Sequence, residues 1–174
     1  MLIQPIIRSC LAGAVAAISL SACDLPSEPI SMHVEKPDSI HFGTSVQAME
    51  SSLNGMCTSL EIRQIEPPLI ADVETQSQID CQGFPYFGKP RLAEFIFVND
   101  ALMLTWILVE ADEIPALESA FTTTFGEPTF SKDTILAYAH NFAGVRNDTP
   151  EALYYSETAA PYVIDRVNRL PDRD

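Results

Sequence analysis

Two β-rich runs, residues 92–98 and 101–109, form the strongest hydrophobic pattern in the chain. Asn99-Asp100 separates them, and both residue types tolerate the positive φ angles of a two-residue turn, so the pattern predicts an antiparallel hairpin. With Val98 opposite Ala101, the pairs expected on one apolar face are Phe97–Leu102, Phe95–Leu104 and Ala93–Trp106. The other face is also substantially apolar, which is typical of strands in the centre of a sheet.

Further short β-rich segments lie on both sides of this hairpin. Strands are expected at residues 58–65, 76–84 and 134–142. Pro67-Pro68 predicts a turn between the first two of them. Residues 153–155 favour a final short strand, although Thr149-Pro150 is also typical of the start of a helix.

Three amphipathic helices are predicted from apolar residues at helical spacing. The first begins at a capping box formed by Thr44 and Gln47 and ends at Asn54-Gly55. The second has Asp112 as its N-cap and ends at Gly126. The third is expected over residues 158–169.

This order of elements predicts an α+β domain over residues 41–170. We expect a single antiparallel sheet of about five to six strands with the helices packed mainly on one face. The chain has 174 residues and 47% hydrophobic content, which suffices for one packed core and gives no sign of a second domain. Residues 171–174 are expected to be a frayed tail.

The N-terminal segment has the pattern of a targeting signal. Arg8 precedes an apolar stretch at residues 11–20, which is the length of a signal-peptide core. Leu20-Ser21-Ala22-Cys23 then resembles the lipobox of bacterial lipoproteins. The resemblance implies a signal peptide at residues 1–22 and a diacylglycerol with palmitate-like chains on Cys23, which would hold the protein on the periplasmic side of the cell envelope. Ordinary secretion and an N-terminal membrane anchor are the alternatives.

The residues after Cys23 predict a spacer between membrane and domain. Asp24 resembles an inner-membrane retention signal, so the inner membrane is favoured over the outer membrane. Pro26, Pro29 and Pro37 interrupt residues 23–40, which therefore predict a flexible tether.

A second, local resemblance begins at the first predicted helix. Phe42-Gly43-Thr44-Ser45-Val46 resembles the opening of small outer-membrane assembly lipoproteins of the SmpA/OmlA (BamE) type. It covers about a dozen residues. The family's Gly-Met-Thr motif and its Leu-Gly-x-Pro helix exit are missing. What it implies is a role in the cell envelope.

The charge of the chain excludes one class of partner. The formal net charge is −14, and the basic residues include only Arg8 before Cys23, so the part after the leader is more acidic still. Phosphate backbones repel such a chain, which argues against nucleic-acid binding. It also argues against an electrostatic contact with anionic lipids, so that membrane attachment depends on the lipid at Cys23.

Two cysteines are left for the domain, because Cys10 lies in the leader and Cys23 is assigned to lipidation. Cys57 and Cys81 form an even pair, and in an oxidising compartment such a pair predicts a structural disulfide. A redox centre would favour a C-x-x-C spacing, and a zinc site would need further Cys or His ligands nearby.

The aromatic segment at residues 83–90 is the candidate binding loop. Phe84, Tyr86 and Phe87 alternate there with Gly and Pro. One interpretation is a loop that folds its aromatic side chains over the edge of the core. The other is a surface that faces a protein partner, because loops often carry binding residues.

The function predicted from these features is non-catalytic. The sequence lacks the nucleophile elbow, the zinc-protease motif and the common nucleotide-binding loops. His140 has no Ser, Cys or Asp constellation near it in sequence. We therefore expect a membrane-anchored periplasmic lipoprotein, with no cofactor and no metal, that binds or scaffolds an envelope protein partner. The alternatives are a small-molecule or lipid-binding module and, less favoured, a hydrolytic enzyme.

Overall fold

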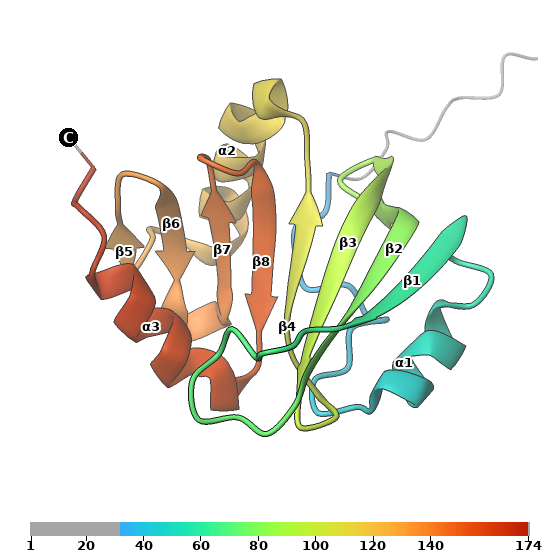
Figure 1. Ribbon diagram of the computed structural model, residues 1–174. Helices are drawn as coiled ribbons and strands as arrows, with labels where there is room; N and C mark the ends of the chain where they lie inside the picture. Colours follow the sequence, from blue (N-terminus) through green and yellow to red (C-terminus); the bar gives the residue numbers. More distant parts are fainter. Residues whose placement is uncertain (1–31, 174) are drawn as a thin grey trace, which may run out of the picture.

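Eight antiparallel strands form one sheet in the computed structural model, which describes residues 32–173 (Figure 1). Their spatial order is β1-β2-β3-β4-β8-β7-β6-β5. The strands are β1 Ser59–Gln64, β2 Gln76–Tyr86, β3 Lys89–Val98, β4 Ala101–Leu108, β5 Phe130–Ser131, β6 Ile135–Tyr138, β7 Ala143–Arg146 and β8 Glu151–Tyr155. The helices are α1 Val46–Leu53, α2 Ile114–Phe125 and α3 Ala160–Asn168, with short 3-10 turns at Ala111–Glu113, Ala139–Asn141 and Glu157–Ala159.

The predicted α+β class with one antiparallel sheet is confirmed, whereas the predicted number of strands is too low. The run predicted as a strand at residues 134–142 is divided, because Phe142 adopts a left-handed φ of 52° after a 3-10 turn and the chain reverses into β7. The additional strand β5 has two residues, too few for a periodic pattern. The segment at residues 150–155 forms the strand β8, which settles the strand-or-helix alternative.

Helices cover both faces of the sheet. The first face packs against α1 and α2, in a core that includes Met49, Leu117 and Phe121. The second face packs against α3 through Val163 and Val167. Figure 1 shows α3 in front of the sheet and α2 behind it. Of the helices in the described part of the chain, two therefore share a face, and α3 lies opposite them.

The helix starts differ in detail from the prediction. The N-cap of α1 is Ser45, whose hydroxyl accepts from the Ala48 amide, rather than Thr44. Before α2, Glu110 and Glu113 form a reciprocal capping box, so that Asp112 is not the cap. None of the helices within residues 32–173 is long and apolar enough to cross a membrane.

A β-bulge shifts the register of the central hairpin. Val98 pairs with Ala101 and Phe97 with Leu102, as predicted. The register then shifts at Met103, and the subsequent pairs are Ile96–Leu104, Phe95–Thr105, Glu94–Trp106 and Ala93–Ile107. The predicted pairs Phe95–Leu104 and Ala93–Trp106 are therefore wrong. An extra residue in one strand moves every later side chain to the opposite face, so Trp106 lies on the second face beside Glu94.

The chain before α1 is packed against the first face. Val34 and Ile40 are fully buried, and the Tyr154 hydroxyl donates a hydrogen bond of 2.6 Å to the Val34 carbonyl oxygen. The predicted flexible tether at residues 23–40 is thus corrected for residues 33–40, where the burial of two apolar side chains fixes the chain despite Pro37. The predicted lipidation site, Cys23, and the predicted signal peptide at residues 1–22 lie outside the described residues.

The C-terminal residues are also attached to the domain. Asp172 forms a β-bridge with Lys132, and the Arg173 amide donates to the Ser131 carbonyl at 3.2 Å. The Arg173 guanidinium also pairs with Glu118 on α2 at 2.8 Å. The predicted frayed tail is wrong for residues 171–173, because backbone pairing and an ion pair hold a segment with few apolar side chains. Asp174 lies outside the described residues.

The predicted disulfide between Cys57 and Cys81 is present, with a Cα–Cα distance of 5.4 Å. It links the segment after α1 to β2 across a sequence separation of 24 residues. Cys81 is fully buried in the first core. The bridge therefore closes the chain segment that contains β1, the edge strand of the sheet.

We expect the double substitution Cys57→Ala and Cys81→Ala to lower the free energy of unfolding by about 3 kcal/mol, because the unfolded chain loses a constraint on a loop of this length. Urea denaturation monitored by circular dichroism measures the change. The reduced wild-type protein should match the double variant. Equal urea midpoints for the oxidised and reduced wild-type proteins would contradict the prediction.

Candidate functional site

The aromatic residues of the predicted binding loop are part of the core. Phe84, Tyr86 and Phe87 are all buried, and Phe84 packs edge-on against Phe95 with ring centroids 5.6 Å apart. The prediction of a long loop is wrong, because β2 and β3 extend to a two-residue turn at Phe87-Gly88, where φ is 47° and 74°. The structure therefore favours the core interpretation over a partner-facing aromatic surface.

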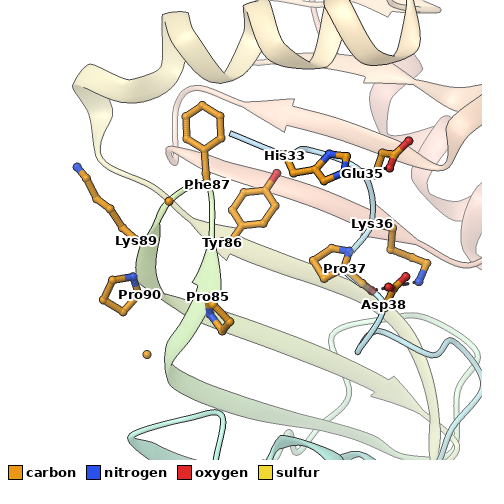
Figure 2. A pocket seen from close by; sticks show the side chains of 12 residues that line it. His33, Glu35, Lys36, Pro37, Asp38, Pro85, Tyr86, Phe87, Lys89 and Pro90 are labelled. Atoms are coloured by element: carbon orange, nitrogen blue, oxygen red, sulfur yellow. Dashed lines mark hydrogen bonds and ion pairs between the residues drawn. The ribbon is translucent and has the colours of Figure 1, made fainter. Parts of the chain in front are cut away.

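A cavity of about 590 Å³ nevertheless lies beside the tip of this hairpin. Figure 2 shows its two walls, one formed by the segment that carries His33 to Asp38 and the other by the turn between β2 and β3. The hydroxyl of Tyr86 is bound to the Tyr154 hydroxyl at 2.7 Å, and Tyr154 in turn donates to the Val34 carbonyl. The hydroxyl group of Tyr86 therefore already has a hydrogen-bond partner within the protein.

The charged residues next to this cavity also hold the fold together. The buried Arg91 guanidinium donates to Glu113 at 2.6 and 3.0 Å and to the Phe87 carbonyl at 3.4 Å. Lys89 pairs with the same carboxylate at 2.7 Å. Hydrogen bonds from Arg91 are the main reason that the pKa of Glu113 is lowered to about 2. This network attaches the hairpin tip to the start of α2 and leaves its groups paired.

A second hollow, of about 320 Å³, lies on the second face of the sheet and has a different composition. We call it the Trp106 groove. Its floor is formed by side chains of β3 and β4, namely Glu94, Ile96, Leu104 and Trp106. One wall is α3 with Tyr162 and Arg166, and the opposite wall is the loop between β1 and β2 with Leu69 and Ile70. Figure 1 shows this loop crossing in front of the lower part of the sheet, on the side of α3.

The rims of the Trp106 groove expose apolar side chains. Leu69 is 80% exposed and Tyr162 is 37% exposed. Leu69 is nevertheless held in place, because the backbone amides of Leu69 and Ile70 donate to the side-chain oxygen of Gln76 at 2.8 and 3.1 Å. Leu69 therefore presents its side chain to solvent from a fixed position at the edge of the groove.

One end of the groove floor contains a cation–π pair. The Arg146 guanidinium lies 5.2 Å from the centre of the Trp106 ring. Asp148 and Glu151 each bind Arg146 at 2.8 Å, which fixes its position. Glu151 is buried, and this burial outweighs the attraction of Arg146 and raises the pKa of its carboxyl to about 7.

Glu94 differs from the other carboxylates of this face. It lies opposite Asp80 across the sheet, and Asp80 is bound by Arg63 at 2.7 Å and by Gln78 at 2.6 Å. Glu94 itself is half-buried and forms no salt bridge within residues 32–173. Burial, and secondly the Asp80 carboxylate, raise the pKa of Glu94. A carboxylate that forms no direct salt bridge among the described residues thus faces the groove.

The other residues considered from the sequence form no reactive cluster. His140 is exposed in a 3-10 turn, and Cys57 and Cys81 are joined as a disulfide. Across residues 32–173 no group of three His, Cys, Asp or Glu side chains is placed to hold a metal ion. The groove was not predicted from the sequence, and the one available signal for it was Glu94, a carboxylate among the apolar residues 92–98.

Comparison with protein-family models, with curated proteins and with solved structures gives no match for this chain. The function is therefore inferred from the sequence, the fold and the two hollows.

The raised pKa of Glu151 predicts a pH dependence of stability. Between pH 4.5 and about 7 the folded protein keeps a proton on Glu151 that the unfolded chain loses, so stability falls as the pH rises through this window. We expect Glu151→Gln to remove this contribution, which is at most about 1.4 kcal/mol per pH unit. Urea denaturation at pH 5, 6 and 7.5 measures it.

The exposed Glu127 provides the matched control. Glu127→Gln should keep the wild-type dependence on pH. Glu151→Gln also removes an ion pair with Arg146, which can lower the free energy of unfolding at every pH. The test is therefore how steeply the free energy of unfolding changes with pH. Parallel curves for the wild type and Glu151→Gln would contradict the prediction.

Proposed function

We propose that this protein is a lipid-anchored lipoprotein of the bacterial cell envelope, and that its domain binds an envelope protein partner without catalysing a reaction. The observation that carries the binding role is the Trp106 groove, with exposed apolar rims at Leu69 and Tyr162 above a floor that includes Glu94. Both exposed side chains line the same hollow, and apolar surface gathered around a groove is characteristic of interaction sites.

The anchor is supported by the N-terminal sequence. Leu20-Ser21-Ala22-Cys23 has the lipobox pattern, and Asp24 favours the periplasmic face of the inner membrane. The disulfide between Cys57 and Cys81 is consistent with an oxidising compartment such as the periplasm. A diacylated Cys23 would attach the domain without a membrane-spanning helix.

A small-molecule or lipid ligand is the second candidate, and the cavity beside Tyr86 favours it. A volume of about 590 Å³ is within the range of ligand pockets. The Tyr86 hydroxyl is, however, already bound to Tyr154, and Lys89 is paired with Glu113. Ligand sites usually keep a few polar groups directed at the ligand, so the Trp106 groove is the better candidate.

A non-catalytic role is supported by the chemistry of the groove. Its ionisable side chains are Glu94, Arg146, Tyr162 and Arg166, and its lining contains no Ser, Cys or His. Arg146 is held by two carboxylates. These side chains can select a partner by its charge and shape, and such selection is what a binding surface requires.

We expect Cys23→Ala to release the protein from membranes, because it removes the residue that would carry the acyl chains. Fractionation of bacterial cells that express the full-length chain, followed by immunoblotting, measures the distribution. The wild type should sediment with membranes and be extracted only by detergent. Membrane attachment of a processed Cys23→Ala protein would contradict the lipoprotein assignment.

A photo-crosslinking benzoylphenylalanine at position 162 tests the binding role. In native membranes, we expect irradiation of this variant to link the full-length lipoprotein to one predominant protein, because Tyr162 lies at the rim of the Trp106 groove. Mass spectrometry identifies the product. The control carries the same group at the exposed Thr124 on α2, on the other side of the sheet. Equal yields at the two positions would contradict partner binding at the groove.

A further inference from the structure

Glu94 occupies a position that the sheet alone does not favour. Its neighbour across β2 is Asp80, and like charges directly opposite each other destabilise an antiparallel pair. The Asp80 carboxylate is bound directly by Arg63 and Gln78, which only partly offset the repulsion at Glu94 by acting to lower its pKa. The electrostatic cost of a second carboxylate at Glu94 is therefore not offset by a salt bridge within residues 32–173.

The two cations of the Trp106 groove form no salt bridge with Glu94 in the part of the chain that the structure describes, although the positive charge of Arg146 acts to lower its pKa. Arg146 is bound by Asp148 and Glu151 and lies over the Trp106 ring. Arg166 is an exposed residue of α3, and it forms no salt bridge with any residue that the structure describes. The groove thus contains a carboxylate, Glu94, and a long cationic side chain on its wall, Arg166, and neither forms a salt bridge with a residue that the structure describes.

The apolar part of the groove defines the shape of what can reach Glu94. Ile96 follows Glu94 by two positions on β3 and projects from the same face, and Leu104 lies opposite Ile96 on β4. Both side chains are buried at the floor. A Lys or Arg side chain has an aliphatic stem that packs on such a surface while its charged end reaches a polar group.

The charge of the whole protein favours the same class of partner. With a formal net charge of −14, the chain attracts positively charged segments and repels acidic ones. The groove is open to solvent between two apolar rims, which suits a segment of polypeptide that lies across it. Leu69 and Tyr162 are placed to contact the residues on either side of an inserted side chain.

We infer that the Trp106 groove receives a Lys or Arg side chain from a basic segment of a protein partner. In this arrangement the cationic end lies at Glu94, the stem packs on Ile96 and Leu104, and the neighbouring residues of the segment contact Leu69 and Tyr162. The inference rests on the proposed partner-binding function and specifies the chemistry of the partner.

Calorimetric titration of the full-length lipoprotein in phosphatidylcholine nanodiscs tests this chemistry. The probe is a blocked pentapeptide of alternating alanine and lysine. Its matched controls are the same peptide with acetyl-lysine, which keeps most of the stem and removes the charge, and the same peptide with glutamate. We expect both controls to bind at least tenfold more weakly than the lysine peptide, because a hydrogen bond to a charged group is lost.

Two variants locate the interaction. Glu94→Gln should weaken binding of the lysine peptide about tenfold or more, and it should retain the wild-type unfolding midpoint or raise it, since it relieves repulsion from Asp80. Arg166→Gln should strengthen binding of the lysine peptide, because it removes a like charge from the groove wall. Equal affinities for the lysine and acetyl-lysine peptides, or full binding by Glu94→Gln, would overturn the inference.

Spermidine and crosslinking separate the remaining outcomes. Binding of spermidine to Glu94 without binding of the lysine peptide would overturn the partner segment in favour of a free amine. A crosslink from position 162 that is as strong in Glu94→Gln as in the wild type would overturn the inference and leave the proposed function intact. The absence of any crosslink specific to position 162 would overturn the proposed function itself.

Discussion

The register shift at Met103 determines the chemistry of both faces of the sheet. Without the extra residue, Trp106 would lie opposite Ala93 and point into the core beneath α2. With it, Trp106 lies on the second face beside Glu94, and Thr105 enters the first core beside Phe95 and Tyr154. The Thr105 hydroxyl is buried there without a hydrogen-bond partner among the described residues, at a cost of about 1–3 kcal/mol. The fold thus accepts an unfavourable group in its main core while an aromatic ring and a carboxylate meet on the other face.

The features that the sequence predicted correctly are those whose signal is local. The helices α2 and α3 and the strands β2 to β4 each have a clear apolar period and a turn or cap at their ends. The pairing of Cys57 with Cys81 followed from elimination, because the other cysteines were assigned to the leader and the anchor. Such features depend on neighbouring residues and on chemical context, both of which can be read without a structure.

The features that could not be predicted depend on distant parts of the chain. The strand β8 lies next to β4 although about 40 residues separate them, and no local pattern encodes that neighbour. The burial of Phe84, Tyr86 and Phe87 follows from the continuation of β2 and β3 past Gly83 and Pro85, which were interpreted as loop residues. The Trp106 groove is formed jointly by α3, the β1–β2 loop and the bulged strand β4. Because these segments are distant in sequence, Glu94 was the one local signal for the groove.

The proposed anchor and the proposed groove are energetically compatible. A hollow of about 320 Å³ that accepts one charged side chain and its neighbours can supply only a weak interaction in free solution, because association has a large entropic cost. A lipid on Cys23 would confine the domain to the same membrane surface as an envelope partner, which raises the effective concentration of each for the other. A weak, charge-selective contact is then sufficient, and the negative charge of the domain would repel acidic partners at the membrane.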